Sequence, residues 1–329
     1  MRELTTDKKE LEAYLKTQDW LTPNEKVVTT EVPGAGNMNF TLRINTGERT
    51  FIIKQSRNYV EKYPQVAAPA HRVLRESDFY SLISKKESLQ KMMPKLTGLD
   101  ADNSVMCMED LGAGSDFTFL YQKERVMSED DLRPIIKFLA SLHNSFSADT
   151  ASMVITNTEM RQLNHEHIFI YPYAHENGLN LNDILPGLEA AAQAYKNDEA
   201  LKKEVLEFGE MYLANGDRLL HGDYFPGSWL KTDSGLKVID PEFCFFGPPE
   251  FDIAVTVAHL KMSDQPTELI EKALKLYGEQ VSFNKTLQEK FTAIEILRRI
   301  LGLAQLPLTI DLNKRKALLE ASRKTLLEI

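Results

Sequence analysis

Cysteine is scarce in this chain, and long hydrophobic runs are missing altogether. Only Cys107 and Cys244 occur among 329 residues, each in an apolar context, so the sequence offers neither a disulfide framework nor a cysteine metal cluster. No apolar run approaches the roughly 18 residues that span a bilayer, so no membrane helix is expected. Basic residues are outnumbered, 39 against 48 acidic ones, and the net charge of −9 disfavours nucleic acid, whose binding depends on a basic surface.

The composition is otherwise that of a globular protein. Hydrophobic residues make up 43% of the chain and charged residues 26%, which gives no bias toward disorder, and we find no internal repeat or low-complexity tract. The length is sufficient for two domains or lobes, each with its own core. Residues 1–15 predict a polar amphipathic helix without the apolar centre of an export signal, so we expect a cytoplasmic protein.

The N-terminal part of the chain predicts strands, within residues 24–55. Residues 38–44 alternate between apolar and polar side chains, and residues 49–55 return after a turn, which indicates a β-hairpin. A charged helix is expected over 69–86 and a short apolar strand over 104–108.

Beyond Asp110 the pattern becomes mainly helical. Apolar residues between 132 and 142 recur at helical spacing, and Ser128 with Asp131 predicts a capping box. Pro134 leaves open where this helix begins, because proline is best placed in a first turn. The other expected helices span 186–214, 251–261, 267–280, 285–303 and 311–329.

These elements predict an α+β fold of two lobes. Residues 1–108 are expected to form an N-terminal lobe around an antiparallel sheet. Residues 109–329 are expected to form a mainly helical C-terminal lobe, with the hinge at about 107–114.

The segment 219–252 carries the most informative motifs. An HGD tripeptide ending at Asp223 is followed five residues later by Ser228, and a predicted hairpin then leads to a DPE tripeptide beginning at Asp240. In kinases, one Asp accepts the proton of the attacking hydroxyl, while a polar residue five positions later and an acid beyond a hairpin hold Mg²⁺. Either tripeptide alone is more often an ordinary turn or strand end. Their order and spacing together favour phosphoryl transfer.

A glycine-rich turn precedes the strand that carries Lys54. The backbone amides of Gly34 and Gly36 can approach phosphate because no side chain intervenes. A strand lysine after such a turn is the kinase arrangement for holding the α and β phosphates, and it requires an acid on the next helix, for which Glu76 is the candidate. Without the other motifs, the glycines would be read as a turn and Glu76 as a local partner of Arg72.

At the predicted hinge, an apolar strand passes into acids and then glycines. This composition suits a segment whose backbone hydrogen-bonds an adenine base. We therefore expect Met108 and Glu109 to lie next to the base, although backbone contacts leave no side-chain mark in a sequence.

These motifs make the chain resemble the choline kinase and aminoglycoside phosphotransferase superfamily, and within it the methylthioribose kinases most closely. The resemblance runs nearly end to end. It rests on five segments, GAGNMN at 34–39, IIKQ at 52–55, LNHEHIF at 163–169, DPEF at 240–243 and RRILGLA at 298–304. It implies a bilobal protein-kinase-like fold and adds Asn37, in the glycine-rich loop, to the expected nucleotide-binding residues.

The resemblance also bears on the metal and the acceptor. The family has a serine where Ser228 stands, which shifts the expected metal coordination toward Asp240 and Glu242, whose carboxylate oxygens suit a hard cation. The chain departs from the family in two ways. It is shorter than typical members, and it has Tyr-Phe-Pro at 224–226 where the family usually has Leu-His-Thr. Because this tripeptide falls beside the expected acceptor, the resemblance implies the reaction type more firmly than the substrate.

Arg298 and Arg299 interrupt an otherwise apolar helical stretch. Adjacent helical residues point about 100° apart, so we expect that both cannot be equally buried, and a solvated face with local partners such as Glu295 is the usual explanation. The resemblance implies a different role, because the family uses this pair to bind sugar hydroxyls. Trp229 is a further candidate for the acceptor pocket, with a position in the core as the alternative.

Two other features of the helical lobe have expected roles. His165 and His167 resemble metal ligands, but with no third ligand nearby we expect structural or hydrogen-bonding roles. Asp252 opens the helix after the DPE tripeptide, and we expect it to brace the backbone of the catalytic loop, as the matching acid does in related kinases.

We therefore expect a small-molecule kinase that uses ATP and Mg²⁺ and transfers the γ-phosphoryl group to a sugar hydroxyl. The leading candidate is the 1-hydroxyl of methylthioribose, in methionine salvage. The first lobe would bind the nucleotide, and the second would supply catalysis and acceptor binding. Two alternatives stay open: a phosphotransferase for another alcohol or an aminoglycoside, and a nucleotide-binding pseudokinase. The expected partner is a sugar or alcohol, with no nucleic acid and no membrane, and a homodimer is left open.

Overall fold

The structure is a computed structural model that describes residues 2–34 and 38–328. It divides into two compact units. The first comprises Met1–Gly114 and Thr232–Cys244, and the second comprises Ser115–Lys231 and Phe245–Ile329. The sequence predicted that the segment 232–244 belongs to the C-terminal lobe, residues 109–329. In the structure this segment packs with the first unit.

A five-stranded antiparallel sheet forms the centre of the first unit, in the order β1-β2-β3-β7-β6. Its strands are β1 (Thr29–Glu31), β2 (Phe40–Asn45), β3 (Thr50–Gln55), β6 (Leu96–Asp100) and β7 (Val105–Glu109). The predicted hairpin is confirmed as β2 and β3, with Leu42 opposite Ile53. The turn between them contains Gly47 at a φ of +84°, in the left-handed region that glycine adopts without strain. With the helices described below, this sheet confirms the expected α+β class.

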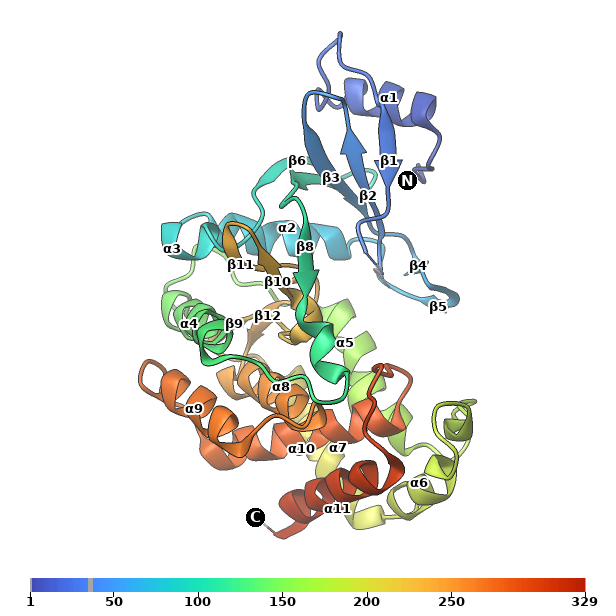
Figure 1. Ribbon diagram of the computed structural model, residues 1–329, viewed down its shortest axis with the longest axis vertical. Helices are drawn as coiled ribbons and strands as arrows, with labels where there is room; N and C mark the ends of the chain where they lie inside the picture. The colour runs from blue at the N-terminus through green and yellow to red at the C-terminus, as the bar shows by residue number, and fades with distance from the viewer. Residues whose placement is uncertain (1, 35–37, 329) are drawn as a thin grey trace. The chain divides into compact units, whose positions relative to one another are not determined.

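Alternation along the strands gives this sheet two different faces. Helix α1 (Lys8–Thr17) lies beside the sheet, as Figure 1 shows, and its Leu11 and Leu15 pack with Ile44 and Ile53 in one hydrophobic cluster. Lys54 follows Ile53 directly, so its side chain points to the opposite face, where it meets helix α2 (Arg72–Ile83).

Shorter elements complete the first unit. They are a hairpin of β4 (Tyr59–Val60) and β5 (Tyr63–Ala67), the single turn α3 (Glu87–Gln90), and β11 (Gly235–Val238). The N–H of Val238 donates to the carbonyl of Met92 at 2.7 Å, which holds the segment 232–244 to the rest of the unit. The chain passes between the units within β8 (Gly114–Asp116), within β10 (Trp229–Thr232) and after Cys244.

The second unit is mainly helical. Its helices are α4 (Glu129–Ser145), α5 (Thr158–His165), α6 (Leu188–Lys196), α7 (Glu199–Leu213), α8 (Pro249–Met262), α9 (Thr267–Gly278), α10 (Lys285–Leu301) and α11 (Leu312–Glu328), and a small antiparallel sheet pairs β9 (Arg218–Leu220) with β12 (Phe245–Gly247). The helix expected over 186–214 is two helices, because Asp198 begins α7 by accepting the N–H of Leu201 at 3.0 Å. Within the described residues, no helix is long and apolar enough to cross a membrane.

Helix α4 begins with the predicted cap. The hydroxyl of Ser128 accepts the N–H of Asp131 at 3.1 Å and donates to the Asp131 carboxylate at 2.8 Å. This arrangement satisfies one of the N–H groups that the first turn leaves without a partner. Pro134 lies inside the helix and not at its first position.

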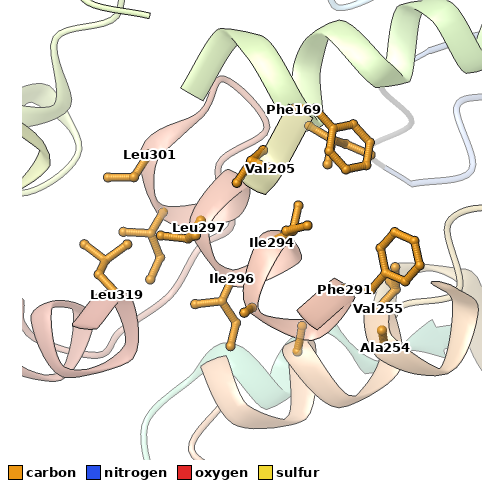
Figure 2. Close-up of a cluster of buried hydrophobic side chains, with 14 of the residues drawn as sticks. Phe169, Val205, Ala254, Val255, Phe291, Ile294, Ile296, Leu297, Leu301 and Leu319 are labelled. Carbon is orange, nitrogen blue, oxygen red and sulfur yellow. The ribbon is translucent and has the colours of Figure 1, made fainter. Parts of the chain in front are cut away.

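Helices α8 and α10 form the core of the second unit. Figure 2 shows the side chains that pack there, which include Val205 of α7, Val255 of α8, and Phe291, Ile294 and Leu297 of α10. Every residue of α10 from 291 to 301 is buried. Polar side chains on these two helices therefore need hydrogen-bonding partners inside the protein.

Candidate active site

Lys54 is the centre of a buried charged cluster in the first unit. Its Nζ lies 2.7 Å from the Glu76 carboxylate of α2 and 2.7 Å from Oδ1 of Asp240. The structure thus contains the expected pair of Lys54 and Glu76. Arg72, the alternative partner of Glu76, has its Nε 3.5 Å from Oε2 of Glu242.

The charge state of Lys54 follows from its neighbours. Burial alone would lower the pKa of Lys54, but the carboxylates of Asp240, Glu76 and Glu242 outweigh burial and raise the pKa. Burial raises the pKa of Glu76, and Lys54 opposes that rise. Lys54 is therefore a fixed cation, suited to contact phosphate oxygens.

Asp240 and Glu242 differ in backbone and in exposure. Asp240 has a φ of +61°, a conformation uncommon outside glycine and often found at functional sites, and its side chain is 54% exposed. Glu242 is buried, and its Oε2 accepts a hydrogen bond from Nδ2 of Asn39 at 2.8 Å. Burial raises the pKa of Glu242, while Lys54 and Arg72 lower it.

The two carboxylates fit a hard divalent cation. Mg²⁺ is usually held by one or two protein carboxylates together with phosphate oxygens and water. Asp240 and Glu242 are oxygen donors of this kind. Among residues 2–34 and 38–328, no group of three or more His, Cys, Asp and Glu side chains is gathered in a way that could hold a metal ion.

The glycine-rich loop is described in part. Gly36 and Asn37 lie outside the described residues. Gly34 has a φ of +99°, and its N–H donates to the carbonyl of Val32 at 2.9 Å. After the loop, the carbonyl of Met38 accepts a hydrogen bond from the guanidinium of Arg72.

The strand before the predicted hinge ends with Met108, which is buried, and Glu109, which is exposed. Arg43 of β2 fixes the segment that follows. Its Nε donates to Asp110 at 2.9 Å and its Nη2 donates to the carbonyl of Gly112 at 3.0 Å. A side chain that the sequence patterns did not single out thus holds this segment to the sheet.

In the second unit, Asp223 lies in a loop that is fixed from two sides. Asp252, in the first turn of α8, accepts the backbone N–H groups of His221 at 2.7 Å and Gly222 at 2.9 Å, which is the brace expected from the sequence. The hydroxyl of Ser228 donates to the carbonyl of Asp223 at 2.8 Å. The loop backbone is rigidly held, while the Asp223 carboxylate stays 23% exposed.

The arginine pair of α10 is buried, with 5% of Arg298 and 6% of Arg299 exposed. The expectation that both cannot be equally buried is wrong, because this part of α10 is enclosed on every side. Their Nε atoms donate to the two oxygens of Glu295, at 2.6 and 2.7 Å. Their Nη2 atoms lie 3.7 and 3.0 Å from Oδ1 of Asp223. Glu295 is the local partner that the spacing indicated, but the pair is not a solvated face.

Burial favours the core alternative for Trp229. Its ring is fully buried and lies 5.6 Å from that of Tyr224, which is also buried and donates to the carbonyl of Ile135 at 2.9 Å. Phe225 is partly exposed, and the Arg299 guanidinium lies over its ring at 5.1 Å. Phe225 is therefore the member of the 224–226 tripeptide that contacts the arginine pair.

The two histidines of the LNHEHIF segment pack against aromatic rings. His165 lies 5.3 Å from the ring of Phe169, and His167 lies 5.7 Å from that of Tyr171. Burial lowers the pKa of both histidines. Both stay neutral near neutral pH, in keeping with a structural role.

Some site residues were not singled out from the sequence as functional. Asn39 and Arg72 contact Glu242, and His259 of α8 contacts Glu295. A signal existed for Asn39, which ends the GAGNMN segment. A weaker signal existed for His259, a polar residue in a helix that is otherwise largely apolar.

Comparison with known proteins gives one family and a consistent set of relatives. The family model described as "Phosphotransferase enzyme family" matches residues 29–286. The methylthioribose kinase of Exiguobacterium sibiricum is 29% identical over 256 residues, which is 74% of this chain and 63% of that protein, less than two thirds of its length. The methylthioribose kinase of Bacillus thuringiensis is 24% identical, with 95% of this chain and 88% of that protein aligned.

Solved structures share the fold. The choline kinase LicA from Streptococcus pneumoniae has a TM-score of 0.55 at 15% identity, covering 98% of this chain and 99% of that one. The gentamicin-APH(2")-IIa complex has a TM-score of 0.54 at 17% identity, covering 100% and 98% of the two chains. These likenesses confirm the expected protein-kinase-like fold.

Proposed function

Because the chain belongs to the phosphotransferase enzyme family, we propose that it is an ATP- and Mg²⁺-dependent kinase that phosphorylates the 1-hydroxyl of methylthioribose, a step of methionine salvage in the cytoplasm. The family and the relatives named methylthioribose kinase indicate a small-molecule kinase with an alcohol group as acceptor. The relatives' name also supplies the candidate sugar.

The nucleotide side of the proposal belongs to the first lobe, residues 1–108, together with the segment around Asp240. Lys54, oriented by Glu76, would hold phosphate oxygens. The loop of Gly34, Gly36 and Asn37 would cover the phosphates. Met108 and Glu109 would lie next to the base. The fixed positive charge of Lys54, which three carboxylates maintain, supports this assignment.

The metal side of the proposal uses Asp240 and Glu242, with Ser228 as a third candidate. A bound Mg²⁺ would neutralise charge on the phosphates. The exposed carboxylate of Asp240 would bind the ion. Asn39 and Arg72 would hold the buried Glu242 in one orientation.

The acceptor side belongs to the helical lobe, residues 109–329. Asp223 would orient the acceptor hydroxyl or accept its proton, and Arg298 and Arg299 would donate hydrogen bonds to neighbouring hydroxyls. The observation that carries the proposal is the 3.0 Å contact between Nη2 of Arg299 and Oδ1 of Asp223, because it brings a proton acceptor and a hydroxyl-binding fork together. Trp229, which is fully buried, is left out of this set.

The charge of this cluster favours a neutral acceptor. The carboxylates of Asp223 and Glu295 are balanced by the guanidinium groups of Arg298 and Arg299. A polycationic aminoglycoside would be bound best by unpaired acids, and two arginines oppose it. A neutral sugar meets hydrogen-bond donors without such repulsion.

The test is an acceptor panel with MgATP that contains methylthioribose, ribose, choline and an aminoglycoside. We expect phosphorylation of methylthioribose. Asp223→Asn should lower kcat by at least about 10²-fold with little change in the KM for ATP, because the catalytic carboxylate is lost while the nucleotide contacts remain. Asp217→Asn, at an exposed acid nearby, is the control.

The panel also separates the alternatives. Transfer to another alcohol in preference to methylthioribose would support the kinase activity and contradict methylthioribose as the acceptor. Nucleotide binding with no transfer to any acceptor would favour the pseudokinase. Wild-type turnover in Asp223→Asn would remove Asp223 from the reaction.

A further inference from the structure

Glu295 is a buried acid that binds both arginines at once. Its Oε2 accepts Nε–H of Arg298 at 2.6 Å and its Oε1 accepts Nε–H of Arg299 at 2.7 Å. Only 2% of Glu295 is exposed. Burial opposes ionisation, but the two arginines outweigh it and hold the pKa of Glu295 well below its usual value, so the acid is a carboxylate.

A second layer of buried groups lies behind Glu295. Nε2 of His259 is 3.1 Å from Oε1 of Glu295, and Nδ1 of His259 is 2.5 Å from the hydroxyl of Tyr121. Burial lowers the pKa of His259 to about 4, with a further contribution from Arg299, so the ring is neutral. A neutral ring between a carboxylate and a hydroxyl carries its proton on Nε2, donates to Glu295 and accepts from Tyr121.

This layering constrains the arginines in a specific way. A guanidinium is a planar fork, so fixing its Nε fixes the plane in which its terminal Nη groups lie. Glu295 uses the Nε of both arginines, and their Nη2 atoms lie near Asp223. A buried charged cluster gains little stability over an apolar one of the same size, so stability alone is a weak explanation for it.

We propose that Glu295, held by His259 and Tyr121, is a positioning residue for the acceptor, which directs the forks of Arg298 and Arg299 toward the hydroxyls beside Asp223. The inference rests on the proposed function, in which the arginine pair binds a neutral sugar. It assigns a role to three residues, Tyr121, His259 and Glu295, that come from three separate segments of the second unit.

The kinetic test compares Glu295→Gln and Tyr121→Phe with the parent protein. Glutamine offers one acceptor oxygen and a competing donor, so one arginine loses its partner, and the KM for methylthioribose should rise about tenfold or more while the KM for ATP is unchanged. Tyr121→Phe removes one hydroxyl that acts on the forks only through His259 and Glu295, so its acceptor KM should rise by a smaller factor, about two- to fivefold. Tyr121→Phe still tests the positioning role if Glu295→Gln folds poorly.

The matched control is Glu289→Gln, on the same helix. Glu289 lies 3.7 Å from Lys285, with 34% of its side chain exposed. Its replacement should leave both KM values as they are.

A second readout does not depend on catalysis. In protein labelled with ¹⁵N-arginine, the Nε–H signals of Arg298 and Arg299 should be protected from solvent exchange, and Glu295→Gln should shift them and speed their exchange at least tenfold. Unchanged signals, or an acceptor KM that moves no more than in the control, overturn the inference. A parent protein that phosphorylates none of the panel rejects the proposed function instead, and the arginine signals then decide the positioning role alone.

Discussion

At the scale of single residues, His259 is a histidine that folding keeps neutral. Its ring lies between Glu295 and Tyr121, and Arg299 and the ring of Phe225 are also close. Burial lowers its pKa from 6.5 to about 4, although Glu295 acts in the opposite direction. The stability of the protein should therefore depend on pH through this one ring.

The sign of this dependence follows from the lowered pKa. Between about pH 6.5 and 4, the unfolded chain binds a proton at His259 and the folded protein does not, so the contribution is complete above pH 6.5 and is lost as the pH falls toward 4. One proton corresponds to about 1.4 kcal/mol per pH unit, or roughly 3 kcal/mol over the window.

His259→Gln removes this titration. Its free energy of unfolding, measured by urea denaturation from pH 4.5 to 7, should fall less steeply with decreasing pH than that of the parent. His175→Gln, at an exposed histidine, should keep the parent's slope. Equal slopes in the parent and His259→Gln would show that the ring is charged in the folded state.

At the scale of elements, the start of α2 holds the chain around the glycine-rich loop. Arg72, the first residue of α2, is 1% exposed, and its guanidinium donates to backbone carbonyls at Met38, Arg57, Tyr59 and Pro69. Its Nε also lies near Glu242. One side chain therefore ties a helix, the loop flank and a metal-ligand candidate together.

Replacing Arg72 with Met should loosen all of these contacts. The carbonyls and the buried Glu242 lose a charged partner, which should lower the free energy of unfolding by roughly 3–5 kcal/mol. Amide hydrogen exchange at residues 38–41 and 57–60 should become faster, and the Kd for MgATP should rise about tenfold or more.

Arg75→Met is the matched control, because Arg75 lies on the same helix, 44% exposed, and pairs with Asp78. Exchange rates and nucleotide affinity in Arg72→Met that equal those of this control would show that Arg72 contributes to packing alone.

At the scale of the whole molecule, the two units have separate hydrophobic cores. One core joins α1 to the sheet, and the other joins α7, α8, α10 and α11 (Figure 2). The candidate phosphate residues belong to the first unit and the candidate acceptor residues to the second. Substitutions of the candidate phosphate residues should therefore weaken nucleotide binding alone. Substitutions of the candidate acceptor residues should weaken acceptor binding alone.

Thermal unfolding can measure this separation. A non-hydrolysable ATP analogue with Mg²⁺ at 100 times its Kd should stabilise the parent by about 2.7 kcal/mol, which raises the Tm by roughly 4 °C. Lys54→Met should lose this shift and keep the shift caused by methylthioribose. Arg299→Ala should show the reverse. Loss of both shifts in either variant would contradict separate binding sets.

The sequence by itself determined the order and type of the main elements, because hydrophobic periodicity is a local property of the chain. The β2–β3 hairpin, the Ser128 cap and the helices α4 and α8–α11 follow from residues within a few positions of one another, whereas α5 was not expected and α6 with α7 was expected as one helix. Very short elements such as β4, which has two residues, escaped prediction because they have too few residues to show a period. The motifs around Asp223 and Asp240 indicated a kinase, since their residue types and spacing are imposed by the chemistry.

Only the tertiary structure decided which side chains are buried and what they contact. It placed Trp229 in the core, buried Arg298 and Arg299 together, and joined Glu295 to His259. The partners in these clusters come from segments far apart in the chain, up to 203 residues for Asn39 and Glu242. No local pattern encodes such pairings. They arise because packing brings distant segments together, and a polar group buried there must find its hydrogen-bonding partner among them.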